Sequence, residues 1–241
     1  MTHAIIGPPA SLDRRRALRF HLDPDVTAKG VTGSYCLLLG VDQTGANADA
    51  IEAFVDQAVA SVRARARRDL ISADPILAGF RTLHRAFGVP TRKLFSAPET
   101  LIRYVEKRGD IPRIGPLVDL YNAVSLETGL ALGAHDIAQI DGDISLRMTT
   151  GSENFHPVGA AEPEPVRPGE YAYVDDGGTV ICRLEVRQVE KTKVTPETTD
   201  VFLIIQGNPA TPPQTIRAGQ DRLVSVLQRF LGGTEVPLYR P

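Results

Sequence analysis

The residues best suited to chemistry lie within one short stretch in the middle of the chain. Asn122 and Ser125 are three positions apart, so a helix places them on one face, where a polar pair meets either a ligand or a buried backbone group. Ser125, His135 and Asp136 are also the residue types of a hydrolase triad. A serine inside a helix, however, lacks the exposed turn and backbone donors that a nucleophile of acyl transfer needs. We therefore expect a substrate-orienting pair or a helix-to-loop tether, and a loop histidine that is satisfied by hydrogen bonds or positions water.

Generic catalytic and metal-binding motifs do not accompany this stretch. The chain contains no GxSxG elbow, no P-loop, no HExxH and no GxGxxG after a strand. Cys36 and Cys182 lie far apart without a CxxC pair, so we expect two core or half-buried thiols and neither a disulfide nor a zinc site. No metal or cofactor is expected.

The elements that must position these residues are helices first and then strands. The helical period of the apolar residues, with caps and closing glycines, predicts helices over residues 48–69, 75–87, 97–107, 116–128 and 217–231. Apolar runs between turn signals predict strands over residues 35–41, 143–148, 171–175, 179–188 and 201–206. This order is typical of an α+β fold in which mixed β-sheets pack against helices.

Length and composition indicate one domain over residues 1–241. The chain has 241 residues, of which 42% are hydrophobic and 23% are charged, enough for a single buried core. No apolar run approaches the roughly 20 residues of a membrane span, and the first residues lack the order of a signal peptide. These features predict a cytoplasmic protein without membrane contact.

The charge is unevenly distributed along the chain. The net charge is -2, but residues 61–113 hold 12 Lys and Arg against 5 Asp and Glu, which is +7 and leaves -9 elsewhere. Such a segment either guides a polyanion to one face of the protein or is an ordinary solvated helix surface. Charge alone leaves both interpretations open.

The stretch GPLVDLYNAVSLETGLALGAHD, residues 115–136, resembles the hallmark run of the B3/B4 editing domain in the β subunit of phenylalanyl-tRNA synthetase. The matching positions are Val118, Asp119, Asn122, Val124, Leu126, Glu127, Gly129, Leu132, Ala134 and Asp136. The resemblance covers roughly residues 75–210, and residues 80–113 look like the lead-in of stand-alone bacterial B3/B4 proteins. It implies a three-layer sandwich, with residues 1–74 as a strand and helix extension and residues 211–241 as a C-terminal helix.

The resemblance also implies an activity. In the synthetase, this domain receives a misactivated amino acid on the 3′ end of tRNA and hydrolyses its ester. Asn122 matches a pocket asparagine of that family, and Tyr121 takes a position usually held by threonine. Gly133 stands where the synthetase domain has a pocket histidine and Ala131 where it has proline. The missing histidine should enlarge the pocket, so the synthetase's preference for tyrosine should not be assumed. Gln206 lies near the place of a pocket glutamate.

From the resemblance we expect an aminoacyl-tRNA hydrolase without a covalent nucleophile, since the ester is already reactive. Asn122 and Ser125 would orient the aminoacyl group, backbone amides near Gly133 and Ala134 would bind the oxyanion, and His135 would position water. A free hydroxyl of the terminal ribose would assist. The expected substrate-binding residues are Tyr121, Gly133, Ala134, Asp136, Glu127, Arg187, Glu190 and Gln206.

The expected partner is the acceptor end of a mischarged tRNA, and no DNA is expected. The residues predicted to hold its phosphates are Arg81, Arg85, Arg92, Lys93, Arg103, Lys107, Arg108 and Lys191. Arg183, Arg187, Lys191 and Lys193 would contact the acceptor stem or the pocket, or are ordinary charges on a strand surface.

The substrate remains open at this point. Tyrosine on phenylalanine tRNA is one option, and the arginine analogue canavanine on arginine tRNA is another. A cationic side chain would require an acidic wall, for which the candidates are Glu127, Glu153, Asp141, Asp143, Glu185 and Glu190. Two other classes of function compete with hydrolysis: a tRNA- or RNA-binding module without catalysis, and a small-molecule-binding protein.

Overall fold

The computed structural model describes residues 18–65, 74–90 and 94–241. Within them the helices are α2 (Pro24–Ala28), α3 (Ala48–Arg63), α5 (Pro75–Ala86), α6 (Ala97–Arg108), α7 (Pro116–Thr128) and α8 (Pro213–Leu231), with a short 3-10 helix, η1 (Ile137–Gln139). The strands are β1 (Phe20–Leu22), β2 (Gly33–Leu39), β3 (Ala131–Asp136), β4 (Ile144–Met148), β5 (Tyr171–Asp175), β6 (Val180–Arg183), β7 (Arg187–Gln188), β8 (Asp200–Gln206) and β9 (Thr234–Tyr239).

Local signals explain where the longer helices begin and end. The side chains of Asn47, Asp74 and Ser96 accept hydrogen bonds from backbone N–H groups in the first turns of α3, α5 and α6. Gly109 and Gly129 end α6 and α7 in the left-handed conformation, with φ of 78° and 70°, which glycine adopts without steric cost. These caps explain why the predicted starts of α3, α5 and α6, and the predicted ends of α6 and α7, lie within one residue of the observed ones.

The strands form two sheets that lie face to face. One sheet has the order β1-β4-β5-β6-β7, in which β1 and β4 are parallel and the other pairs are antiparallel. The second has the order β3-β8-β2-β9 and is antiparallel throughout. The strand β3 is therefore an edge strand.

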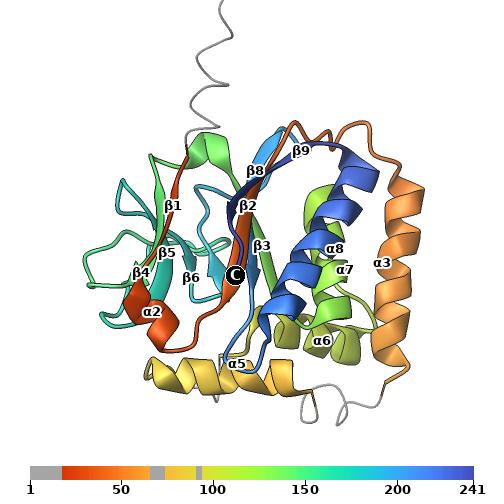
Figure 1. The fold of residues 1–241 in the computed structure, drawn as a ribbon. Helices are drawn as coiled ribbons and strands as arrows, with labels where there is room; N and C mark the ends of the chain where they lie inside the picture. Colours follow the sequence, from red (N-terminus) through yellow and green to blue (C-terminus); the bar gives the residue numbers. More distant parts are fainter. Residues whose placement is uncertain (1–17, 66–73, 91–93) are drawn as a thin grey trace, which may run out of the picture.

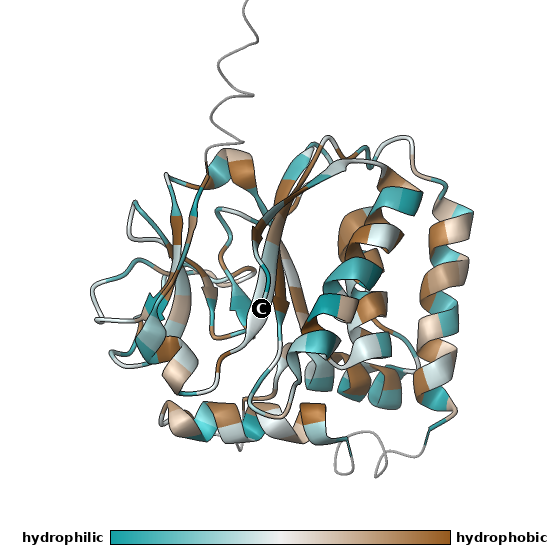
Figure 2. Cartoon of the chain, viewed as in Figure 1, coloured by the Kyte–Doolittle hydropathy of each residue, from teal (hydrophilic) through white to brown (hydrophobic). Residues whose placement is uncertain are grey.

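The sheets and helices form three layers, as the sequence predicted (Figure 1). The helices α3, α6, α7 and α8 cover one face of the sheet that contains β3, and the mixed sheet covers the other face. One apolar core fills the space between helices and sheet, with Leu117, Val124 and Leu203 among its members. A second core, with Tyr173 and Phe202, lies between the two sheets. Apolar residues face these interfaces, and hydrophilic residues lie mainly on the outer helix surfaces (Figure 2).

The structure corrects four predicted elements. The helix predicted over 48–69 ends at Arg63, and residues 66–73 lie outside the described part of the chain. The strand predicted over 179–188 is two strands, because residues 184–186 form a turn. That turn holds no Gly, Pro or Asn, so the alternating apolar pattern ran through it without interruption.

The other two corrections concern segments expected to have no strand. Residues 131–136, interpreted as a loop, form β3; this stretch is short and rich in Ala and Gly, which are poor strand formers, and it becomes a strand by pairing with β8. The C-terminal segment 211–241 is not helical throughout, because β9 follows α8 and pairs with β2. Pro237 sits in this outermost strand, where its missing N–H is tolerated.

Candidate functional site

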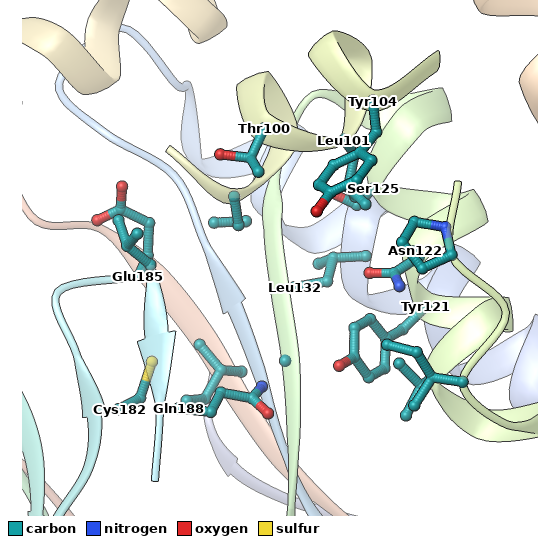
Figure 3. Close-up of a pocket in the computed structure, with 18 residues that line it drawn as sticks. Thr100, Leu101, Tyr104, Tyr121, Asn122, Ser125, Leu132, Cys182, Glu185 and Gln188 are labelled. Atoms are coloured by element: carbon teal, nitrogen blue, oxygen red, sulfur yellow. The ribbon is translucent and has the colours of Figure 1, made fainter. Parts of the chain in front are cut away.

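A cavity of about 370 Å³ lies where the helix layer, the free edge of β3 and the mixed sheet meet. Its walls come mainly from α6, the loop after it, α7, the first half of β3, and the segment from the end of β6 through β7 (Figure 3). The lining includes Asn122 and Tyr121 on one side and Glu185 and Gln188 on the other. Tyr104 and Ile114, which are 40% and 67% exposed, also belong to it. The cavity is large enough for an amino acid side chain and a terminal ribose.

The helix α7 holds the polar wall of the cavity in place. Its entry is fixed because the carboxylate of Asp119 accepts hydrogen bonds from the N–H groups of Ile114 at 2.8 Å and Gly115 at 3.4 Å. Nearly all of the helix is buried between its neighbours, yet Asn122 keeps intermediate exposure and lines the cavity. No hydrogen bond to the Asn122 side chain is found among the described residues. Its amide is therefore available to a ligand.

Ser125 shares this face but its hydroxyl is already used. The side chain is 1% exposed, and Oγ donates a hydrogen bond of 2.7 Å to the carbonyl oxygen of Leu130. This bond connects α7 to the chain that enters β3, which is the tether that the sequence left as an alternative. Ser125 contributes to the cavity wall through its position.

The edge strand β3 presents backbone groups to the cavity. The N–H of Asp136 donates to the carbonyl of Thr192 at 2.9 Å, on the side of β3 away from β8. Since N–H directions alternate along a strand, the N–H groups of Leu132 and Ala134 face the same open edge, and that of Gly133 faces β8. Leu132 and Gly133 both line the cavity, whereas Ala134 is fully buried against the helix core.

Gly133 leaves space that a side chain would fill. A Cβ atom at this position would lie 3.0 Å from Nε2 of Gln188. The amide end of Gln188 is flexible, so it would have to move aside for any larger residue. Glycine at this position thus brings the two sheets close together beside the cavity.

His135 lies outside the cavity. It is fully buried, Nδ1 is 2.8 Å from Oγ1 of Thr192, and Nε2 has no hydrogen-bond partner. Burial lowers the pKa of His135 to about 3, so the ring stays neutral. Because β3 directs His135 into the space beside Thr192, the structure does not bring it together with Asn122.

The far wall of the cavity holds a carboxylate that is already paired. Nε2 of His84 lies 2.7 Å from Oε1 of Glu185, each side chain is 1% exposed, and the hydroxyl of Tyr171 donates to Oε2 of Glu185. Burial by itself would lower the pKa of His84, but the charge and hydrogen bond of Glu185 and the charge of Glu99 raise it. Among the described lining residues Glu185 is the one acidic or basic side chain, and its two oxygens are engaged by His84 and Tyr171.

Gln206 does not line the cavity and lies behind the wall that Glu185 forms. Its Oε1 accepts from the hydroxyl of Tyr173 at 2.6 Å, and its Nε2 donates to the hydroxyl of Tyr171 at 2.9 Å. Gln206 therefore reaches the cavity only through Tyr171 and Glu185.

Tyr121 faces the cavity from α7. Burial raises the pKa of its hydroxyl, and the hydrogen bond with Gln188 opposes this rise.

The other predicted substrate-binding residues lie away from the cavity. Asp136 accepts hydrogen bonds from the N–H of Ala138 and the hydroxyl of Thr198. Glu127 pairs with Arg222, Glu190 with Lys193, and Arg187 with Glu164. Of the six acidic candidates for a cation-binding wall, only Glu185 lines the cavity; Glu153, Asp141 and Asp143 pair with Arg147, Lys191 and Arg19.

The predicted tRNA-binding cations within the described residues fall into two groups, one that forms ion pairs with carboxylates and one that does not. Arg81 and Arg103 both bind the buried carboxylate of Glu99, and Lys191 pairs with Asp141 and Asp175. Three cations on α5 and α6 are exposed and have no ion pair within the described residues; they are Arg85, Lys107 and Arg108. Arg92 and Lys93 lie outside the described part of the chain.

Sequence reasoning missed Tyr104, Gln188 and the part that Cys182 plays in the wall. No local pattern marks them, because they come from α6, β6 and β7, and only the packing of these elements against α7 brings them to Asn122. Both cysteines are buried free thiols, as expected. Among the described residues no group of three or more His, Cys, Asp or Glu side chains could hold a metal ion. None of the described helices is both long and apolar enough to cross a bilayer.

Comparison with known proteins finds relatives of similar sequence and a solved structure of similar fold. Two curated proteins are similar to the chain: the phenylalanine–tRNA ligase beta subunits of Vibrio vulnificus strains YJ016 and CMCP6, each 33% identical over 97 residues. These matches span 40% of this chain but 12% of each relative.

A crystal structure of an N-terminal fragment of the phenylalanyl-tRNA synthetase beta subunit from Pyrococcus horikoshii has the same fold, with a TM-score of 0.51 at 13% identity. It covers 92% of this chain and 55% of the fragment. Residues 85–230, more than half of the chain, match the family model of the B3/4 domain. The chain therefore belongs to the B3/4 domain family.

Proposed function

We propose that this protein is an aminoacyl-tRNA deacylase that acts in trans on the ester of a mischarged tRNA. The observation that carries the proposal is the unpartnered amide of Asn122, which lines a cavity beside the open edge of β3. The relatives named as subunits of a tRNA ligase support tRNA as the partner. The proposal places the protein in the cytoplasm, with the translation machinery.

The geometry suggests how the ester would be held. The Asn122 amide would donate to the aminoacyl group, and the N–H of Leu132, on the open edge of β3, would stabilise the oxyanion. Water attacks the ester carbonyl carbon, the bond to the ribose oxygen breaks, and that oxygen takes up a proton as the free amino acid leaves. The adjacent ribose hydroxyl would guide the water, because the buried ring of His135 does not reach the cavity.

The character of the cavity favours an uncharged side chain on the amino acid. Its walls are mainly apolar, with the polar groups of Tyr121, Asn122 and Gln188 placed to orient a substrate. Both oxygens of its carboxylate, Glu185, are already hydrogen-bonded, one to His84 and the other to Tyr171, so this carboxylate is not free to bind a cation. An aromatic such as tyrosine on phenylalanine tRNA fits this wall better than canavanine on arginine tRNA, which would have to compete with His84 for Glu185.

The test is amino acid release from a panel of tRNAs that carry correct, near-cognate and nonprotein amino acids. Asn122→Ala should lower kcat/KM by about a hundredfold, because the aminoacyl group loses the donor that holds it in position for attack by water. Its free energy of unfolding should stay close to that of wild type, because the side chain has no partner in the described structure. Asn154→Ala, at an exposed position away from the cavity, is the matched control and should keep full activity.

The same panel separates the competing functions. If wild type binds tRNA in a salt-dependent way but releases no amino acid from any of them, the protein is a non-catalytic tRNA- or RNA-binding module. If it binds neither tRNA nor its esters, the cavity serves a small molecule and the deacylase proposal falls.

A further inference from the structure

A second cavity, of about 450 Å³, lies next to the first on the other side of the turn between β6 and β7. Val186, in this turn, lines both cavities. The floor of the second cavity is apolar and includes Leu94, Leu184 and Val186. A ligand long enough to pass over Val186 would therefore occupy both.

The two cavities differ in charge. The first has no cation in its described lining, whereas the second is lined by Arg167, Arg183 and Arg187 against one carboxylate, Glu170. With Glu164, which pairs with Arg187, three positive and two negative charges leave +1 among the described residues. Arg167 is exposed and has no ion-pair partner within the described residues.

The other two arginines are held by carboxylates but keep donors free. Arg183 binds Glu170 through Nε at 2.7 Å and Nη2 at 3.0 Å, and its Nη1 has no hydrogen-bond partner among the described residues. Arg187 binds Glu164 through Nη1 at 2.5 Å, and its remaining nitrogens stay available. Carboxylates that fix one side of a guanidinium orient the other side, so these arginines are arranged in advance for an anion.

The turn that separates the cavities is strained and firmly held. Leu184 has φ of 53°, and it is the one non-glycine residue with positive φ in the described chain. A bulky side chain in this region costs energy and persists only where the surroundings enforce it. Here the Leu184 N–H donates to Tyr171, and the next residue, Glu185, is fixed by His84.

We propose that the arginine-lined cavity binds the phosphate-bearing nucleotide that precedes the terminal adenosine of an RNA 3′ end, while the terminal ribose and its ester occupy the first cavity. This inference rests on the proposed function. The guanidinium groups match the phosphate, the apolar floor accepts a base, and the shared Val186 makes the two cavities direct neighbours, as two successive nucleotides require.

The test compares binding of adenosine with binding of the dinucleotide CpA, which adds one nucleotide and one phosphate. Wild type should bind CpA about tenfold more tightly, and Arg167→Gln and Arg187→Gln should each remove most of that advantage. Arg229→Gln, at an exposed position on α8 away from both cavities, is the matched control and should retain it. Arg167 has no ion pair to lose, so this variant should fold normally.

Two results would overturn the inference: no advantage of CpA in wild type, or an advantage that survives in both arginine variants. Tight binding of cytidine monophosphate that does not compete with tRNA would assign the cavity to a free nucleotide and also overturn it. Hydrolysis of aminoacyl esters is measured separately on the same proteins. If CpA binding behaves as expected but no ester is cleaved, the deacylase proposal fails and the nucleotide site stands.

Discussion

At the scale of single residues, Asn122 and Ser125 show how two polar groups on one helix face acquire different roles. The amide of Asn122 has no protein partner in the described structure, and the hydroxyl of Ser125 is bound to Leu130. Removing the Asn122 amide should weaken the binding of a ligand, and removing the Ser125 hydroxyl should lower the stability of the fold.

Ser125→Ala tests this division. The change leaves the buried carbonyl oxygen of Leu130 without its donor, so the free energy of unfolding should fall by about 1–3 kcal/mol. Urea denaturation measures this loss, and Ser225→Ala, at an exposed position on α8, should change stability little. Deacylation per folded molecule should stay within a fewfold of wild type. A loss of activity as large as that of Asn122→Ala, without loss of stability, would instead make the hydroxyl part of the reaction.

At the scale of elements, the edge strand β3 both opens toward the cavity and buries a histidine. Its pairing with β8 directs His135 into a site where Nδ1 meets Thr192 and Nε2 meets no partner. The strand thus carries a neutral imidazole that is costly to protonate.

The protein should lose stability in acid because of this histidine. Burial lowers the folded-state pKa of His135 to about 3, below the ordinary value of 6.5, so the unfolded chain binds a proton that the folded protein does not. The free energy of unfolding is therefore undiminished at pH values above the ordinary histidine pKa of 6.5, and it falls as the pH drops from there toward about 3. Between about pH 7.5 and about pH 5 the loss should be about 2 kcal/mol.

Urea denaturation across this pH range checks the prediction. His135→Leu removes the titrating ring and should remove this part of the pH slope. Thr192→Val removes the hydroxyl partner but keeps the imidazole, so it should retain the slope. An identical slope in wild type and His135→Leu would show that the acid sensitivity comes from other groups.

At the scale of the whole molecule, carboxylates of the protein itself neutralise part of the positive charge of residues 61–113. Arg81 and Arg103 neutralise Glu99, and Arg113 binds Glu52, Asp56 and Asp110. The exposed Arg85, Lys107 and Arg108 remain for phosphates, so the net charge of -2 conceals three exposed cations on α5 and α6 that have no ion pair within the described residues.

Binding of tRNA should accordingly weaken as salt increases. Contacts to about three phosphates predict a loss of affinity of about tenfold to a hundredfold between about 50 and about 200 mM salt. The combined variant Arg85→Gln, Lys107→Gln, Arg108→Gln should lower the logarithmic salt slope by about 2 to 3, measured by fluorescence anisotropy with labelled tRNA. Arg229→Gln is again the control, and an unchanged slope in the triple variant would remove α5 and α6 from the binding surface.

The sequence by itself determined the α+β class, most helix limits and the central stretch around Asn122. Caps, closing glycines and the helical period act locally, so neighbouring residues suffice to read them. The stretch of residues 115–136 also pointed to the family, because its motif is continuous along the chain.

Only the tertiary structure decided which side chains meet at the cavity. Glu185 and Gln188 are more than 60 positions from Asn122 in the chain and reach it because the β6–β7 turn packs beside β3. His135 and Gln206 looked equally suited to the site, yet the pairing of β3 with β8 directs the first into the interior and places the second behind Tyr171. Strand pairing and layer packing depend on contacts between distant segments, and no local pattern encodes them.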